Sequence, residues 1–247
     1  MISSKQNIVI ILAAGKGTRM NSDLPKVLHD LNNKPLLKHV IDTANTLKPK
    51  DIIVVVGYKK DLVINKFKTE NIVFVEQKTQ KGTADAIKYC LHKIKQFNGN
   101  ILILSGDVPM IKSETLLKLI DTHNSNKSLG SLISAKLEDP TGYGRIIKNN
   151  KQQLIKIVEH KDATNQEKQI DEINSGIYIF DSATLNKTIP LIDNHNAQEE
   201  YYLTDIFNFI NEKDTAIYQI KNYKEISGIN TSDQLEELEK STSWKNQ

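Results

Sequence analysis

Cysteine, arginine and long apolar segments are all scarce in this 247-residue sequence. The single cysteine, Cys90, excludes an intrachain disulfide, a cysteine-ligated zinc site and an iron–sulfur cluster, and it favours a reducing compartment. The longest uninterrupted apolar run covers only residues 8–14, whereas a membrane span needs roughly 20 residues. This run is followed at once by Gly-Lys-Gly-Thr-Arg rather than by a signal-peptide cleavage site. We therefore expect a soluble, cytoplasmic protein that does not associate with membranes.

Charge is nearly balanced, since 33 basic and 30 acidic residues give a net charge of +3. An excess this small and this dispersed argues against nucleic acid as a partner. Only two of the 33 basic residues are arginines, Arg19 and Arg145, and both lie in glycine-rich segments. A guanidinium presents a rigid fork that suits phosphate, so both positions are candidates for phosphate binding, although chance would also account for two such arginines.

The first half of the sequence alternates buried strands with amphipathic helices. Four runs have the continuous hydrophobicity of strands that are covered on both faces, at residues 8–12, 52–56, 72–75 and 101–104. Three segments carry apolar residues at helical spacing, at residues 35–47, at residues 83–97 and from Ser113 onward. This order predicts an α/β protein with a three-layer, Rossmann-like architecture and a mixed, mainly parallel sheet.

In the second half the predicted strands follow one another closely, at residues 132–135, 145–147, 154–158 and 177–180. We expect antiparallel strands that extend the same sheet or form a flap over it. The polar residues 161–171 predict an exposed loop. Thr231 and Gln234 have the spacing of a capping box and predict a last helix, with a frayed tail from Ser241.

A glycine-rich string, LAAGKGTRM, follows the first predicted strand at residues 12–20, and Leu-Pro-Lys comes soon after at 24–26. At the carboxyl end of a strand, backbone N–H groups of such a loop can cradle phosphate, and Arg19 and Lys26 add positive charge. The string lacks the spacing of a Walker loop, and Met20 replaces the third glycine of a dinucleotide fingerprint. An ordinary turn would account for Gly-x-Gly alone, but the whole string favours phosphate binding.

Further candidates lie after other strands. Asp107 follows the strand at 101–104, where a carboxylate can hold Mg²⁺ beside phosphate, although aspartate is also common in tight turns. Gln77, Gly82 and Thr83 lie at the start of a helix, whose N-terminus attracts polar ligands, although Thr83 also suits a simple N-cap. The segments at residues 140–145, 158–162 and 173–176 are weak signals that structural turns also give.

Taken in order, these segments resemble those of the sugar-nucleotide pyrophosphorylases. The string LAAGKGTRM with LPK is typical of the wider nucleotidyltransferase superfamily. Three segments narrow the resemblance, PTGYGRI at 140–146, IVEHKDA at 157–163 and NAQEEYYLTDI at 196–206. They are similar to the uridyltransferase domain of bacterial bifunctional N-acetylglucosamine-1-phosphate uridyltransferase/glucosamine-1-phosphate acetyltransferases. The resemblance covers about residues 8–240 and implies a nucleotide-diphospho-sugar transferase fold, with the nucleotidyltransferase domain at 1–230 and a C-terminal helix and tail at 231–247.

The resemblance also implies an activity and a site. The activity would be Mg²⁺-dependent transfer of uridylyl from UTP to N-acetylglucosamine 1-phosphate, a step toward peptidoglycan and the cell wall. Leu12, Ala13, Ala14 and Gly15 would line the uridine pocket, with Gln77 and Gly82 on the uracil and Thr83 beside them. Arg19, Lys26 and Asp107 would be catalytic, and Asp107 and Asn230 would hold Mg²⁺. Gly142, Glu159 and Asn174 would bind the amino sugar. Because the acceptor is already an anion, catalysis would be mostly positioning and charge neutralisation.

Several residues depart from the family pattern. Ser105 stands where some relatives have tyrosine, Lys81 and Asp85 replace an apolar residue and a histidine, and His160 replaces a glutamine. The exact sugar and base therefore stay open, and glucose 1-phosphate with UTP or dTTP is the main alternative. The missing third glycine disfavours an NAD-dependent oxidoreductase, and the complete phosphate and metal set disfavours a non-catalytic nucleotide sensor.

The chain also carries no hexapeptide repeat. We therefore expect no left-handed β-helix domain, no acetyltransferase activity and no trimer held by such a domain. The sequence leaves the oligomeric state open.

Overall fold

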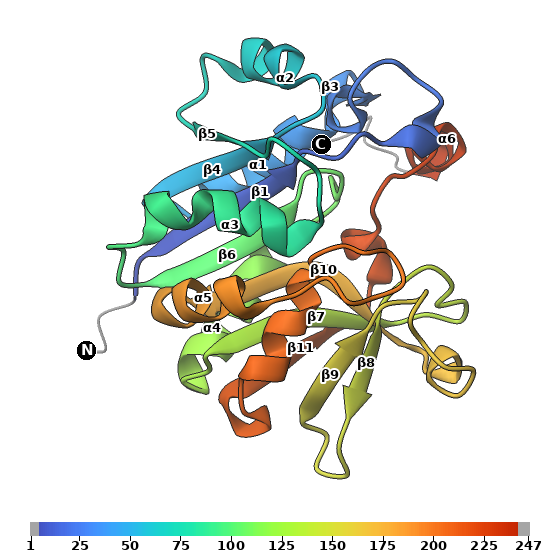
Figure 1. Cartoon of the computed structure of the whole chain (residues 1–247). Helices are drawn as coiled ribbons and strands as arrows, with labels where there is room; N and C mark the ends of the chain where they lie inside the picture. Colours follow the sequence, from blue (N-terminus) through green and yellow to red (C-terminus); the bar gives the residue numbers. More distant parts are fainter. Residues whose placement is uncertain (1–4, 242–247) are drawn as a thin grey trace.

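The computed structural model describes residues 5–241 and arranges them around one large sheet (Figure 1). Its strands are β1 (Asn7–Ala13), β4 (Asp51–Val56), β5 (Val73–Glu76), β6 (Asn100–Ser105), β7 (Gly130–Lys136), β8 (Arg145–Lys148), β9 (Leu154–Val158), β10 (Glu172–Asp181) and β11 (Thr215–Ile220). A separate hairpin pairs β2 (Asp30–Leu31) with β3 (Lys34–Pro35). The main sheet has the order β11-β7-β10-β6-β1-β4-β5, with β8 paired to both β10 and β9.

Most strands of this sheet run in one direction. β1 pairs in parallel with β4 and β6, β4 with β5, and β11 with β7, whereas β10 runs antiparallel to both β6 and β7. The prediction of a mixed, mainly parallel sheet is confirmed. β7 and β10 extend the sheet of the first half, and β8 and β9 form an antiparallel ribbon attached to β10. The sequence did not predict β11.

Helices cover both faces of the sheet, which gives the expected three layers. They are α1 (Leu36–Thr46), α2 (Lys60–Phe67), α3 (Thr83–Ile94), α4 (Ser113–Ser125), α5 (Ser182–Thr188) and α6 (Ser232–Ser241). Successive side chains of β1 point to opposite faces of the sheet, so they contribute to two separate hydrophobic cores. Ile8 and Ile10 pack with α3 and α5, while Val9 and Ile11 pack with α1 and α4. In Figure 1, α3 and α5 lie in front of the sheet and α1 lies behind it.

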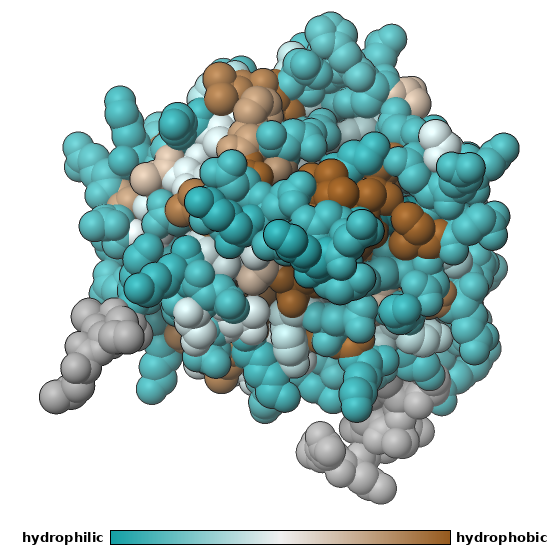
Figure 2. All heavy atoms as spheres, turned by 90° about the horizontal axis from the view of Figure 1, so that it is seen from below, coloured by the Kyte–Doolittle hydropathy of each residue, from teal (hydrophilic) through white to brown (hydrophobic). Residues whose placement is uncertain are grey.

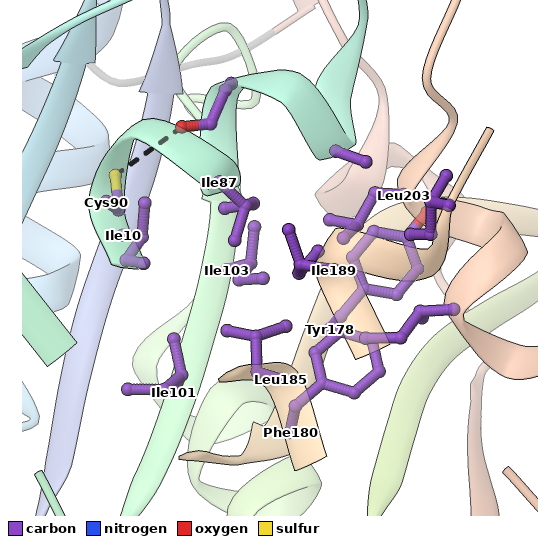
Figure 3. Close-up of a cluster of buried hydrophobic side chains, with 14 of the residues drawn as sticks. Ile10, Ile87, Cys90, Ile101, Ile103, Tyr178, Phe180, Leu185, Ile189 and Leu203 are labelled. Carbon is purple, nitrogen blue, oxygen red and sulfur yellow. Dashed lines mark hydrogen bonds between the residues drawn. The ribbon is translucent and has the colours of Figure 1, made fainter. Parts of the chain in front are cut away.

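The core beneath α3 and α5 is shown in Figure 3, where Tyr178 and Phe180 from β10 meet Leu185 from α5. Cys90 of α3 is fully buried in the same cluster, and its Sγ lies 3.6 Å from the carbonyl oxygen of Ala86. Burial raises the pKa of Cys90 to about 12. The thiol is therefore protonated at neutral pH, so Cys90 acts as a small core residue and not as a nucleophile.

The surface is mostly hydrophilic, with apolar side chains grouped on the face seen from below in Figure 2. Ile155 of β9 and Phe209 are among the exposed large apolar residues.

Among residues 5–241, no helix combines the length and the hydropathy that crossing a bilayer requires. The predicted loop at residues 161–171 is largely exposed and includes one short 3₁₀ turn, Glu167–Gln169. The frayed tail was predicted from Ser241, but Ser241 is the last residue of α6, and the rest of that tail lies outside the described residues.

Candidate active site

Four side chains from three distant segments meet beyond the carboxyl ends of β1 and β6. Asn230 Oδ1 accepts hydrogen bonds from Arg19 at 3.0 Å and from Lys26 at 3.1 Å. Lys26 Nζ also donates to the Asp107 carboxylate, forming an ion pair whose side chains are 16% and 20% exposed. Arg19, Lys26, Asp107 and Asn230 are the predicted catalytic and metal-ligating residues, and the fold brings all four side chains together.

Gly17 fixes the place of Lys26 beside the glycine-rich loop. Its φ of +63° is in the left-handed region, which disfavours a side chain. A Cβ at this position would lie 2.5 Å from Cβ of Lys26, closer than two non-bonded carbon atoms can approach. The second glycine of the string is therefore required because the loop packs directly on Lys26.

Asn230 is held in place by the start of α6. The Ile229 N–H donates to the Asp107 carbonyl at 2.9 Å, which ties this segment to the end of β6. Thr231 Oγ1 accepts from the Gln234 N–H at 3.2 Å, and Gln234 Oε1 accepts from the N–H groups of Thr231 at 3.2 Å and Asn230 at 2.7 Å. The predicted capping box is confirmed, and it anchors the backbone of a site residue.

We expect Thr231→Ala to loosen α6 without unfolding the protein. Removing an N-cap hydroxyl costs about 1 kcal/mol, which corresponds to about fivefold faster hydrogen exchange of the Ser232–Ser241 amides. Glu237→Ala, at an exposed position of the same helix, is the matched control and should leave exchange unchanged. Equal exchange in Thr231→Ala and wild type would contradict the capping role.

A pocket of about 310 Å³ opens beside this cluster, between the first loop and the start of α3. Its wall is formed by Leu12, Ala14, Gly15, Lys16, Gln77, Gln80, Gly82, Thr83, Ala86 and Glu200. Six of the seven residues that we expected at the uridine are in this wall. The seventh, Ala13, points its side chain into the core shared with α1, so only its backbone can face a ligand.

The shape of this pocket depends on Gly82. Its φ of +113° and ψ of 176° are accessible essentially only to glycine, and a Cβ there would lie 2.5 Å from the carbonyl oxygen of Tyr201. Tyr201 donates to the Lys81 carbonyl at 2.8 Å and accepts from the Ala84 N–H at 2.9 Å. These two backbone hydrogen bonds hold the segment around Tyr201 against Gly82, and this places Glu200 in the pocket wall.

The three predicted sugar-binding residues come from three neighbouring segments: Gly142 precedes β8, Glu159 directly follows β9, and Asn174 lies in β10. Gly144 separates two of them, because a Cβ on it would lie 3.4 Å from Oε2 of Glu159 and 3.5 Å from Cβ of Asn174. Asn174 is buried and donates to the hydroxyl of Tyr178 at 2.7 Å. Gly142 lies in the exposed turn just before Gly144, with a φ of +85°. Glu159 Oε1 accepts from Thr204 Oγ1 and Asn174 Oδ1 accepts from the Gly176 N–H, both at 3.3 Å, so each side chain keeps acceptor capacity for a polar ligand.

The two arginines have different surroundings. Arg19 is exposed and bonds to Asn230 within the cluster, and its role as a phosphate ligand stays a prediction. Arg145 is only 1% exposed, and its guanidinium donates to the carbonyl oxygens of Tyr143 and of Lys168. We therefore interpret Arg145 as a structural residue that joins two loops, contrary to its candidacy for phosphate.

Negative charge accumulates next to Glu159. Burial raises the pKa of the Glu159 carboxyl. Burial also raises the pKa of Asp205 to about 6, and the negative charges of Asp193 and Asp162 add to this. Both groups thus bind protons more tightly in the folded protein than in the unfolded chain, where their pKa values are ordinary.

Asp205→Asn is expected to stabilise the protein at pH 7.5 but not at pH 4. Because the pKa of Asp205 is higher in the folded state, its protonation stabilises the fold. This contribution to the free energy of unfolding is fully present below the unfolded pKa of 3.8 and is lost as the pH rises through the folded pKa of about 6. Asp205 is partly exposed, so we expect a gain of only about 1–2 kcal/mol at pH 7.5. Urea denaturation at both pH values measures it, with the exposed Asp121→Asn as control. An equal effect at both pH values would contradict the prediction.

The oxygens of Asp107 and Asn230 fit a divalent cation, because Mg²⁺ prefers hard oxygen ligands. Lys26 Nζ already bonds to both oxygens, so positive charge is accommodated between them. Among residues 5–241, no three His, Cys, Asp or Glu side chains are grouped to hold a metal ion. Mg²⁺ usually keeps several water ligands and binds substrate phosphates beside one or two carboxylates, and Asp107 with Asn230 would suit that manner of binding.

Sequence reasoning missed Lys16, Gln80 and Glu200 in the pocket wall and the role of Asp85, whose Oδ2 accepts from Gln77 Nε2 at 2.8 Å. Lys16 lies in the glycine-rich string, so its position was a usable signal. Glu200 lies within the segment at residues 196–206 that carried the resemblance, but nothing local in that segment points to the pocket.

The sequence of this chain is similar to those of known nucleotidyl transferases. Residues 8–244 match the nucleotidyl transferase family. "Bifunctional protein GlmU" from Streptococcus mutans is 42% identical over 95% of this chain and 51% of its own length. The proteins of the same name from Alkaliphilus metalliredigens and Idiomarina loihiensis are 45% and 44% identical over 93% and 94% of this chain. The chain spans about half the length of these curated relatives.

A solved structure supports the fold. The crystal structure of a "Putative Glucose-1-Phosphate Thymidylyltransferase" from Bacillus anthracis, in complex with a sucrose, aligns with a TM-score of 0.72. The alignment covers 96% of this chain and 97% of that chain at 19% identity. At this identity the likeness establishes the architecture alone, and it agrees with the predicted nucleotide-diphospho-sugar transferase fold.

Proposed function

The chain belongs to the nucleotidyl transferase family, and we propose that it transfers uridylyl from UTP to N-acetylglucosamine 1-phosphate with Mg²⁺ as cofactor. The observation that carries the proposal is the cluster of Arg19, Lys26, Asp107 and Asn230 beside a glycine-lined pocket. Identity of 40–45% to proteins named GlmU over most of the chain supports the same branch of the family.

The reaction forms one bond and breaks one. A phosphate oxygen of the sugar phosphate attacks the α-phosphorus of UTP, and the bond from that phosphorus to the oxygen bridging toward the β-phosphate breaks. The products are UDP-N-acetylglucosamine and pyrophosphate. The attacking oxygen is already anionic, so no general base is required, and the main obstacle is the repulsion between two polyanions.

Residues of this chain would reduce that repulsion by neutralising phosphate charge and by positioning the substrates. Arg19 and Lys26 supply two positive charges at the end of the glycine-rich loop, where they would neutralise the triphosphate and the departing pyrophosphate. Gln77, Gly82 and the loop at residues 12–15 would hold the uridine, and Glu159 and Asn174 would orient the sugar. Bound Mg²⁺, held by Asp107 and Asn230, would supply further positive charge to the phosphate oxygens.

A matrix of substrates tests the proposal. Pyrophosphate release is measured for UTP, dTTP and CTP against N-acetylglucosamine 1-phosphate and glucose 1-phosphate, with and without Mg²⁺. We expect the highest kcat/KM for UTP with N-acetylglucosamine 1-phosphate. A higher kcat/KM with glucose 1-phosphate would favour the alternative sugar, and absence of turnover in the whole matrix would contradict a catalytic role.

A further inference from the structure

Gln77 lies at the inner wall of the nucleotide pocket and is held there at both ends of its backbone. The residue is only 3% exposed. Its N–H donates to the carbonyl oxygen of Val56 at 2.8 Å, and its carbonyl oxygen accepts from Gln80 Nε2 at 3.0 Å. The side chain therefore starts from a fixed point directly after β5.

The orientation of the Gln77 amide is also determined. Its Nε2 donates to the carbonyl oxygen of Gly82 at 3.1 Å and to Asp85 Oδ2 at 2.8 Å. A carbonyl oxygen and a carboxylate can only accept hydrogen bonds, so the nitrogen of the amide has to face them and the oxygen has to face away. Both N–H groups are used, and within residues 5–241 no group of the chain bonds to Gln77 Oε1.

We infer that Asp85 is a positioning residue that makes the pocket select a pyrimidine carrying a ring N–H, uracil or thymine, over cytosine. The inference rests on the proposed function, because it takes the pocket as the nucleotide site. With its orientation fixed, Gln77 offers the ligand one acceptor and no donor. The N3–H of uracil donates to such an acceptor, whereas N3 of cytosine is itself an acceptor and faces Oε1 unfavourably.

Asp85 also has a simpler role that has to be separated from this one. It lies in the first turn of α3, where a negative charge stabilises the helix. That role requires no contact with Gln77, and its loss would affect every nucleotide equally. Asp85 is not part of the wall of the 310 Å³ pocket; it lines a second hollow of about 180 Å³ together with Lys88, and its hydrogen bond from Gln77 links it to the first pocket.

The test compares the binding of UTP and CTP to the whole chain by titration calorimetry. Wild type should prefer UTP, and Asp85→Ala should reduce the ratio of the two affinities about tenfold, mainly by weakening UTP. Asp85→Asn keeps an oxygen that can accept the Gln77 bond and should retain a ratio within about threefold of wild type. Lys88→Ala, which alters the same hollow without touching Gln77, is the matched control and should leave the ratio unchanged.

Asp85→Ser serves as a second variant should the alanine variant not fold, because serine suits a helix start but is too short to reach Gln77. An unchanged ratio in a folded Asp85→Ala or Asp85→Ser variant would overturn the inference, and so would a wild type that binds CTP as tightly as UTP. Pyrophosphate release reports separately on the proposed function. A preference for UTP without turnover would overturn that function alone, and turnover with UTP in a wild type and an Asp85→Ala variant that share the same ratio of UTP to CTP affinity would overturn the inference alone.

Discussion

Asp107→Ala is expected to lower kcat for pyrophosphate release by at least about 100-fold, because groups that stabilise developing charge contribute on this scale. The Asp107 carboxylate is the acidic member of the cluster and pairs with Lys26. Without it, Lys26 and Arg19 would bring two positive charges to Asn230 Oδ1 with no carboxylate to hold them, and a divalent cation would lose its charged ligand.

Two further variants separate charge from shape. Asp107→Asn keeps the size of the side chain and one oxygen, so its kcat should lie between those of wild type and Asp107→Ala. Glu114→Ala removes an exposed carboxylate from the first turn of α4, which follows the same strand, and should retain full activity. Turnover of Asp107→Ala within threefold of wild type, measured at saturating Mg²⁺, would contradict the catalytic assignment.

The parts of this site that the sequence predicts are those fixed by short-range patterns. The runs at 8–12, 52–56 and 101–104 are continuous and apolar because β1, β4 and β6 are buried on both faces, so their type and place were predictable. The glycine-rich string follows β1, and Asp107 follows β6. Because neighbouring parallel strands end on the same side, both had to lie at the same edge of the sheet.

What the sequence alone could not predict depends on long-range packing. Asn230 reaches Asp107 only through the backbone bond from Ile229, and only the family resemblance singled it out. β11 was missed because its residues are mostly half-buried and lack a clear pattern. The predicted strand at 177–180 covers only the end of β10. The earlier part was missed because a register shift between Asn174 and Tyr178, with Gly176 at a φ of +76°, interrupts the alternation of its side chains.

The same strand carries the largest expected effect on stability. Phe180→Ala should reduce the free energy of unfolding by about 3–5 kcal/mol, as for other large aromatic residues removed from a core. Phe180 is fully buried, and its ring lies 5.9 Å from that of Tyr178 and 5.4 Å from that of Phe207 (Figure 3 shows Phe180 beside Tyr178). Gly130 fits against the ring, since a Cβ there would lie 3.0 Å from it.

Urea denaturation measures this loss, and Phe209→Ala, at a side chain that is 47% exposed, should change stability by less than about 0.5 kcal/mol. Phe180→Ala should also act on the site, because Tyr178 accepts the hydrogen bond of Asn174 and packs on the removed ring. We therefore expect KM for the sugar phosphate to rise more than KM for UTP at a temperature where the variant is folded. Equal changes in the two KM values would mean that this core supports the fold alone, without positioning the sugar end of the site.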